Sequence, residues 1–147
     1  MQFAEFIRVF LVYSQWSLEA LLLPPTLIAT IVLTGSLVAA FPSQKPSHDG
    51  LWRHHYWVVF SQLIFFPVVI VIGVLFRVVD PGPPYHANVM GERLLDLCFL
   101  LSLATGCFWI YRMKRLRWLA ASLVLLQEIP LLCAAFIAGM SVSGDWI

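Results

Sequence analysis

The chain has 147 residues, of which 61% are hydrophobic and only 12% are charged. Soluble domains carry charge at roughly 25% of positions, so this composition excludes a disordered chain and argues against a water-soluble globule. The formal net charge of +1 gives no electrostatic reason to expect a nucleic-acid partner. The composition therefore predicts one integral membrane domain over residues 1–147.

The N-terminal segment, residues 1–16, is predicted to be an amphipathic helix that lies in the membrane interface. Gln2, Glu5 and Arg8 recur at helical spacing, and large apolar residues occupy the positions between them. This pattern is typical of a helix with one face in the lipid and one face in water.

An alternative assigns the same region to a broken helix. One piece would cover residues 3–23, the break would fall at Pro24 and Pro25, and a shorter piece would cover residues 26–41. The interfacial helix is preferred, because the alternative immerses four polar residues in lipid. These are Glu5, Arg8, Gln15 and Glu19.

Four apolar stretches are long enough to cross about 30 Å of hydrocarbon as helices, which takes about 20 residues each. They lack the alternation of apolar and polar residues that a membrane β-strand requires. A helix also satisfies its own backbone hydrogen bonds in lipid. The sequence therefore predicts an all-α protein with four transmembrane helices in an antiparallel bundle, over residues 18–41, 57–76, 94–111 and 118–140.

Basic residues near the span ends predict the orientation of the bundle. Six of them fall in the loops 42–56 and 112–117, whereas the opposite side has three. Because cytoplasmic loops are enriched in Lys and Arg, these two loops are predicted to be cytoplasmic, with both termini outside. The membrane would be a plasma membrane or a bacterial inner membrane. Four residues of the second loop either set this orientation or bind lipid headgroups: Arg112, Lys114, Arg115 and Arg117.

Glu128 lies near the middle of the fourth predicted span, where an acidic side chain costs on the order of 2.5–3.5 kcal/mol. Ala121, Ala135 and Gly139 follow spacings that place them on the same helical face. Small residues allow helices to approach closely, so Glu128 is predicted to point into a helix–helix interface. We expect the acid to be neutral unless a cation or a basic residue of another chain reaches it.

Other polar residues lie at similar depth if the helices are straight. Thr30 belongs to a row of threonines with a spacing of four residues, and Ser102 and Gly106 form a small-xxx-small pair that favours helix packing. The second span adds Gln62. Helix packing is the preferred role of the threonine row, with a conduction path as the alternative. The predicted intramembrane polar site consists of Glu128, Gln127, Thr30, Ser102 and Thr105.

Three acids lie near the predicted outer boundary: Glu19, Glu92 and Asp96. They form a candidate outer mouth that could hold a cation or begin a proton entry path. The preferred interpretation of Glu92 and Asp96 is simpler, because acids in the first turn of a helix interact favourably with its dipole.

Histidine and aspartate in the first loop offer possible metal ligands. The preferred interpretation is that no metal binds, because adjacent histidines on a short interfacial loop are common without one. No histidine lies inside a span, so an intramembrane axial ligand for haem is lacking and no cofactor is predicted. The loop residues in question are His48, Asp49, His54 and His55.

The sequence contains no P-loop, nucleophile-elbow or zinc-protease motif, so a non-enzymatic role is favoured. The leading hypothesis is a membrane subunit that assembles with itself or with other membrane proteins through small-residue helix faces around a central acid. The first alternative is an ion or proton pathway centred on Glu128. The second is a membrane-embedded enzyme or a lipid- or quinone-binding unit.

Overall fold

The computed structural model describes residues 3–40, 60–78, 87–113 and 117–144. Every regular element in these ranges is helical, as the composition predicts. Two of them, α5 and α6, are long and apolar enough to cross a membrane. In chain order the elements are α1 (Phe3–Ala20), α2 (Pro24–Ala40), the 3₁₀ helix η1 (Phe60–Ile64), α4 (Phe65–Leu75), α5 (Val89–Arg112) and α6 (Arg117–Ser143).

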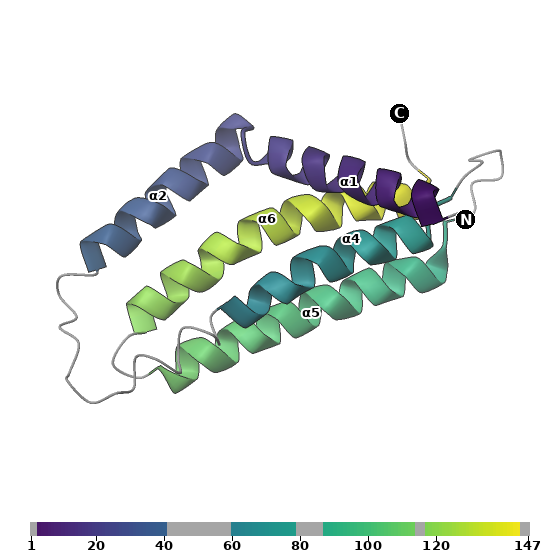
Figure 1. The fold of residues 1–147 in the computed structure, drawn as a ribbon. Coiled ribbons are helices and arrows are strands. Elements are labelled where there is room, and N and C mark those ends of the chain that lie inside the picture. The colour runs from purple at the N-terminus through teal and green to yellow at the C-terminus, as the bar shows by residue number, and fades with distance from the viewer. Residues whose placement is uncertain (1–2, 41–59, 79–86, 114–116, 145–147) are drawn as a thin grey trace.

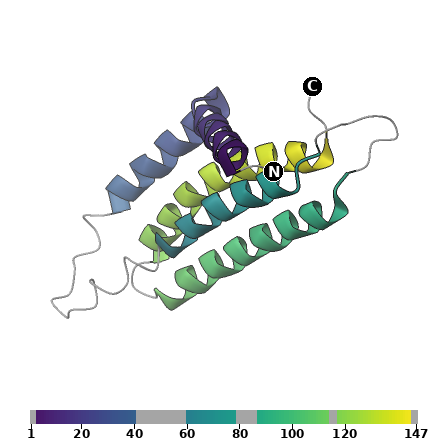
Figure 2. The same cartoon turned by 45° about the vertical axis from the view of Figure 1, so that its right-hand side comes forward.

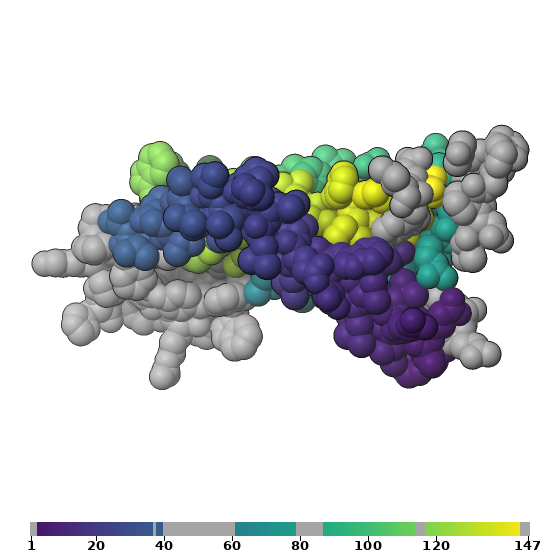
Figure 3. All heavy atoms as spheres, turned by 90° about the horizontal axis from the view of Figure 1, so that it is seen from above, coloured from purple at the N-terminus to yellow at the C-terminus, as the bar shows by residue number. Residues whose placement is uncertain are grey.

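The last helix, α6, is the centre of the fold. It packs against α1 and α2 on one side and against α4 and α5 on the other (Figure 1). Figure 2 shows that α1 crosses the common direction of the other helices. Seen from above in Figure 3, α2 covers the N-terminal half of α6, and α1 diverges from its C-terminal half. The buried apolar residues of α6 include Val124, Leu131, Ala134, Ile137, Ala138 and Val142.

The first predicted span, residues 18–41, does not form one continuous helix. Residues Phe3–Ala20 form α1, and the chain then bends by 71° before α2. The end of α1 and the start of α2 lie within about three residues of the ends that the broken-helix alternative predicts. By length and hydropathy the bent pair together would make a third span.

The prolines explain the position of this bend. Pro24 and Pro25 have no N–H groups to continue the hydrogen bonds of α1, whereas proline is well tolerated in the first turn of a new helix. The Thr26 hydroxyl lies 2.7 Å from Ala20 O, the last carbonyl of α1, and 2.8 Å from Leu23 O in the turn that follows, so its single proton is available to either acceptor. The break is therefore closed by a side chain rather than left with bare carbonyl groups.

The N-terminal helix is longer than the predicted segment 1–16 and packs against both α4 and α6. Tyr13 is buried, and its hydroxyl lies 2.7 Å from Ser141 Oγ of α6. Ser141 donates its single hydroxyl proton to Gly73 O of α4 at 3.0 Å, so Tyr13 is the donor in the first bond. This network, Tyr13–Ser141–Gly73, joins three helices.

The described part of the second predicted span, residues 57–76, is also not one continuous α-helix. Its helical part is η1 followed by α4, and residues 57–59 lie outside the described residues. Pro67 cannot donate a hydrogen bond to Leu63 O, so the backbone at this point departs from a regular α-helix. The 3₁₀ turn precedes it, as is common at helix N-termini.

The ends of the helices gather at the two ends of the described fold. At one end Arg77 pairs with Glu5, and Val78 N donates to Ser141 O at 3.1 Å, so the start of α1, the end of α4 and the end of α6 lie together. The start of α5 joins them. The opposite end holds the end of α2, the start of η1, the end of α5 and the start of α6 (Figure 1).

Candidate functional site

Glu128 lies near the middle of α6 and faces α5 and η1 rather than the outside of the protein. Its side chain is buried, with 7% of the residue exposed. Ser102 of α5 is fully buried beside it, and Gln62 of η1 is 3% exposed. The predicted helix–helix interface around Glu128 is therefore present, and it lies within a single chain.

Hydrogen bonds join these three side chains into one centre, here called the Glu128 centre (Gln62, Ser102 and Glu128). Ser102 Oγ donates to Glu128 Oε1 at 2.7 Å. Gln62 Nε2 donates to the same oxygen at 3.3 Å and to Ser102 O at 3.1 Å. Because the amide nitrogen meets two acceptors, this network also determines the orientation of the Gln62 amide group.

Gly106 makes the approach of Gln62 possible. A Cβ added at Gly106 would lie 2.6 Å from Gln62 Nε2 and 2.7 Å from Val124 Cγ1. Both distances are shorter than a real Cβ contact, so a side chain at Gly106 would displace one of these groups. The pair formed by Ser102 and Gly106 thus supplies both a hydroxyl and the space beside it, one helical turn apart.

Two buried oxygen atoms of the Glu128 centre have no hydrogen-bond partner among the described residues: Glu128 Oε2 and Gln62 Oε1. Gln127 Oε1 is a third such atom, on the residue that precedes Glu128. Buried polar atoms in native proteins are almost always paired, so each exception requires an explanation. All three atoms are acceptors, so each lacks a hydrogen-bond donor among the described residues.

Gln62 was not predicted as a member of the site. The available signal was one amide side chain in an otherwise apolar run, and its depth could not be judged on the assumption of a straight helix. The 3₁₀ turn before Pro67 changes the direction in which the Gln62 side chain leaves the backbone.

The two predicted threonines do not join the centre. The Thr30 hydroxyl donates to Thr26 O at 2.8 Å, and the Thr105 hydroxyl donates to Leu101 O at 2.7 Å. Both bonds return to the preceding turn of the same helix, a common way for threonine to satisfy its hydroxyl in an apolar environment. The threonine row therefore does not supply donors to a shared path.

The predicted small-residue face is only partly used for close packing. Gly139 has no neighbouring atom within 4 Å of an added Cβ, so it makes no close helix contact. Ala121 and Ala135 are half-buried, and Ala135 packs against the core. The close approach of α4 and α6 occurs instead at Gly73, where an added Cβ would lie 2.7 Å from Ala138 Cβ.

The three predicted outer-mouth acids are not brought together. Glu92 and Asp96 lie in the first turns of α5, half-buried and exposed respectively. Glu19 is exposed at the far end of α1, about 21 Å of helix rise from Glu5, and it accepts a hydrogen bond from Gln15 at 2.7 Å. The length of α1 therefore carries Glu19 away from the end of the bundle where α5 begins.

The remaining predicted residues lie at the opposite end of the bundle or outside the described ranges. Arg112 ends α5 and Arg117 begins α6, and both are exposed. No cluster of three metal-ligating side chains occurs in the part of the chain that the structure describes. The residues that lie outside it are Lys114, Arg115, His48, Asp49, His54 and His55.

Comparison with protein-family models, with curated protein sequences and with solved structures found no match to this chain.

Proposed function

We propose that the Glu128 centre binds a proton and is the central site of an ion or proton pathway through the membrane. The observation that carries this proposal is the unpaired Glu128 Oε2, an acidic oxygen buried at the meeting point of α5, α6 and η1. Acidic residues inside membrane proteins are costly, and they commonly mark proton relays and ion paths.

A proton suits this centre better than a metal cation. No ion pair involves Glu128 in the described ranges, so the centre holds one carboxylate and no basic side chain. Metal ions that prefer oxygen, such as Ca²⁺ and Mg²⁺, take about six or more ligands. A proton needs only a single carboxylate. A bound proton turns the acid into a neutral group and gives the centre a further hydrogen-bond donor.

The same geometry weakens the leading hypothesis from the sequence, in which Glu128 meets a partner chain. That hypothesis rested on a central acid without an evident basic partner inside its own chain and on small-residue helix faces. Glu128 accepts hydrogen bonds from the neutral side chains of Ser102 and Gln62 and is 7% exposed, so little of it is open to a second chain. Assembly around this acid is therefore not part of the proposal.

The proposed arrangement in the membrane has four passes. The bent pair α1–α2 forms the first, η1 with α4 forms the second, and α5 and α6 form the third and fourth. The charge bias of the loops places both termini outside and the loops 42–56 and 112–117 in the cytoplasm of a plasma or bacterial inner membrane.

Proton flux into vesicles tests the proposal. Purified protein in liposomes should carry protons down an imposed potential, and Glu128→Gln should abolish that flux. The substitution keeps the size of the side chain and its ability to accept a hydrogen bond from Ser102. A glutamine side chain, unlike a carboxylate, cannot bind and release a proton. Glu19→Gln makes the same chemical change at an exposed acid and is the matched control.

A wild-type protein without flux, or a Glu128→Gln variant with unchanged flux, would contradict the pathway. Carbodiimide modification gives a second measurement, because this reagent attacks protonated carboxyl groups in apolar surroundings. We expect modification at Glu128 in the wild type and none at Glu19.

A second candidate function is assembly through α2. This helix packs on α6, yet none of its described side chains is buried. Ile28, Ile31 and Val32 are 61%, 62% and 62% exposed on its outer face. A cysteine at Ile31 should cross-link to another chain in native membranes, whereas one at Leu100, 62% exposed on α5, should not. Equal cross-linking at both positions would indicate random collision in lipid.

A further inference from the structure

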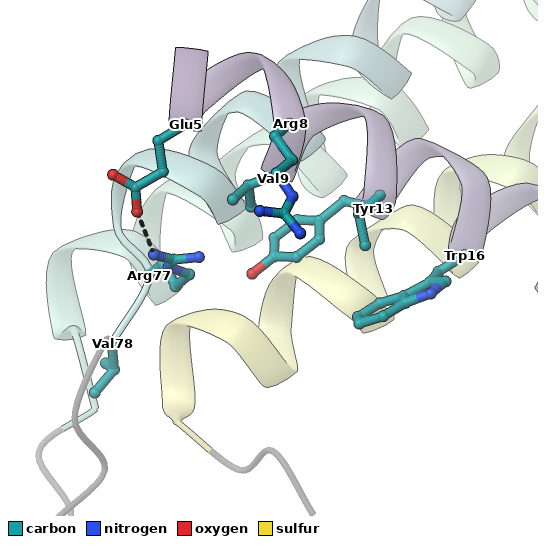
Figure 4. A pocket seen from close by; sticks show the side chains of 8 residues that line it. Glu5, Arg8, Val9, Tyr13, Trp16, Arg77 and Val78 are labelled. Atoms are coloured by element: carbon teal, nitrogen blue, oxygen red, sulfur yellow. Dashed lines mark hydrogen bonds and ion pairs between the residues drawn. The ribbon is translucent and has the colours of Figure 1, made fainter. Parts of the chain in front are cut away.

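A groove opens between α1 and the segment that follows α4, at the end of the bundle where the chain begins (Figure 4). Its volume is about 510 Å³, which is in the range of small-molecule sites. Three charged side chains, Glu5, Arg8 and Arg77, lie along it. Val9 and Val12 of α1 form part of its apolar wall.

The groove carries excess positive charge. Arg77 Nη2 lies 3.1 Å from Glu5 Oε1, but both side chains are partly exposed, and such pairs are weak. Arg8 forms no ion pair within the described ranges, and Figure 4 shows its guanidinium group directed into the same groove as that of Arg77. The groove therefore contains two guanidinium groups and one carboxylate.

In the four-pass arrangement proposed above, the groove would lie at the level of lipid headgroups. Arg77 follows the end of α4, and Val78 is tied to the last turns of α6 by its backbone hydrogen bond to Ser141 O. The rings of Tyr13 and Trp16 line the inner part of the groove. Rings with a polar group are typical of the boundary between lipid and water. A ligand here would meet arginines at one end and apolar side chains at the other.

We propose that this groove binds an anionic phospholipid, with the phosphate held between Arg8 and Arg77. Guanidinium groups match the oxygen geometry of phosphate and form charge-assisted hydrogen bonds with it. The glycerol and the start of the acyl chains would lie against Val9 and Val12. Glu5 competes with the phosphate for Arg77 and so limits the affinity. This lipid site is separate from the Glu128 centre and does not depend on proton binding there.

Titration of the full-length protein with phosphatidylglycerol, followed by native mass spectrometry, tests this site. Phosphatidylglycerol should bind at least about fivefold more tightly than phosphatidylcholine, whose choline group cancels the phosphate charge. Arg8→Gln should weaken phosphatidylglycerol binding by about fivefold, the effect of one basic residue near an anionic lipid. Glu5→Gln should strengthen it by a similar factor, because the competing carboxylate is gone.

Arg93→Gln is the matched control, because Arg93 is exposed at the same end of the bundle but does not line the groove. Its affinity for phosphatidylglycerol should equal that of the wild type. Equal weakening by Arg8→Gln and Arg93→Gln would overturn the site in favour of general surface charge. Complete displacement of the lipid by an equal concentration of inorganic phosphate would indicate a simple anion site. Unchanged affinity in Glu5→Gln would also overturn the proposal, even if Arg8→Gln failed to fold.

Discussion

Two buried polar networks hold the helices of this protein together, and they differ in how completely their hydrogen bonds are formed. In the Tyr13–Ser141–Gly73 network, Tyr13 donates to Ser141 and Ser141 donates to the Gly73 carbonyl. In the Glu128 centre, Glu128 Oε1 accepts from Ser102 and Gln62, but Glu128 Oε2 and Gln62 Oε1 have no partner among the described residues.

This difference is the basis on which we propose a functional role for the Glu128 centre and a structural role for the other network. A network that only supports packing gains most when every buried donor and acceptor is paired, because an unpaired buried group costs about 1–3 kcal/mol. The protein meets this requirement where α1, α4 and α6 meet. The Glu128 centre retains unpaired acceptors, and a site that binds and releases a proton needs that capacity.

The largest expected effect on stability comes from Gly73, which belongs to the fully paired Tyr13–Ser141–Gly73 network. An added Cβ would lie 2.7 Å from Ala138 Cβ and 2.9 Å from Ala138 Cα, and the backbone atom cannot rotate away. We expect Gly73→Ala to lower the free energy of unfolding in detergent by about 1–3 kcal/mol.

Gly139→Ala is the control for this substitution, because an added Cβ there meets nothing within 4 Å. It should leave stability unchanged or raise it by up to about 1 kcal/mol, since alanine favours a helix more than glycine does. Equal destabilisation by the two variants would show that the α4–α6 contact at Gly73 is not close.

The next effect in size contrasts Tyr13→Phe with Glu128→Gln. Tyr13→Phe removes one buried hydrogen bond and should lower unfolding free energy by about 0.5–1.5 kcal/mol, with proton flux unchanged. Glu128→Gln should abolish flux and change stability by less than about 1 kcal/mol, because the acceptor for Ser102 remains. Thermal unfolding and vesicle flux should be measured on both variants. Loss of both stability and flux in each variant would refute the distinction between the two networks.

The smallest effect is expected at the threonines outside both networks. Thr30→Val and Thr105→Val remove hydroxyls that bond only to their own helix, and valine keeps the branched shape. Unfolding free energy should change by less than about 0.5 kcal/mol, and flux should not change. A large loss of flux in Thr30→Val would show that the threonine row takes part in the proton path.

Much of this fold was predictable from local pattern. Length and hydropathy predicted helices over 94–111 and 118–140, and these ranges lie inside α5 and α6. The same reasoning failed at residues 18–41, where a long apolar run outweighed the signal of Pro24 and Pro25. Hydropathy measures affinity for lipid and is insensitive to a missing N–H group, so a broken helix and a straight one have the same profile.

The candidate site was predictable only in part. The cost of a buried acid identified Glu128, and the small-residue spacing identified Ser102 and Gly106. The hydrogen bonds from Ser102 and Gln62 cross between helices, and no periodicity in the sequence reports which residues meet at such a crossing. Gly139 shows the opposite error. Its spacing from Glu128 predicted close helix packing, but an added Cβ there meets no atom within 4 Å.

The sequence by itself determined the helical class, the two long apolar helices and the place of Glu128 within one of them, because composition and periodicity act through the solvent and the local backbone. The tertiary structure decided the direction in which Glu128 faces, the arrival of Gln62 beside it, and the meeting of Arg8 with Arg77 in one groove. These depend on the 71° bend after α1 and on the 3₁₀ turn before Pro67, which set distances between residues far apart in the chain.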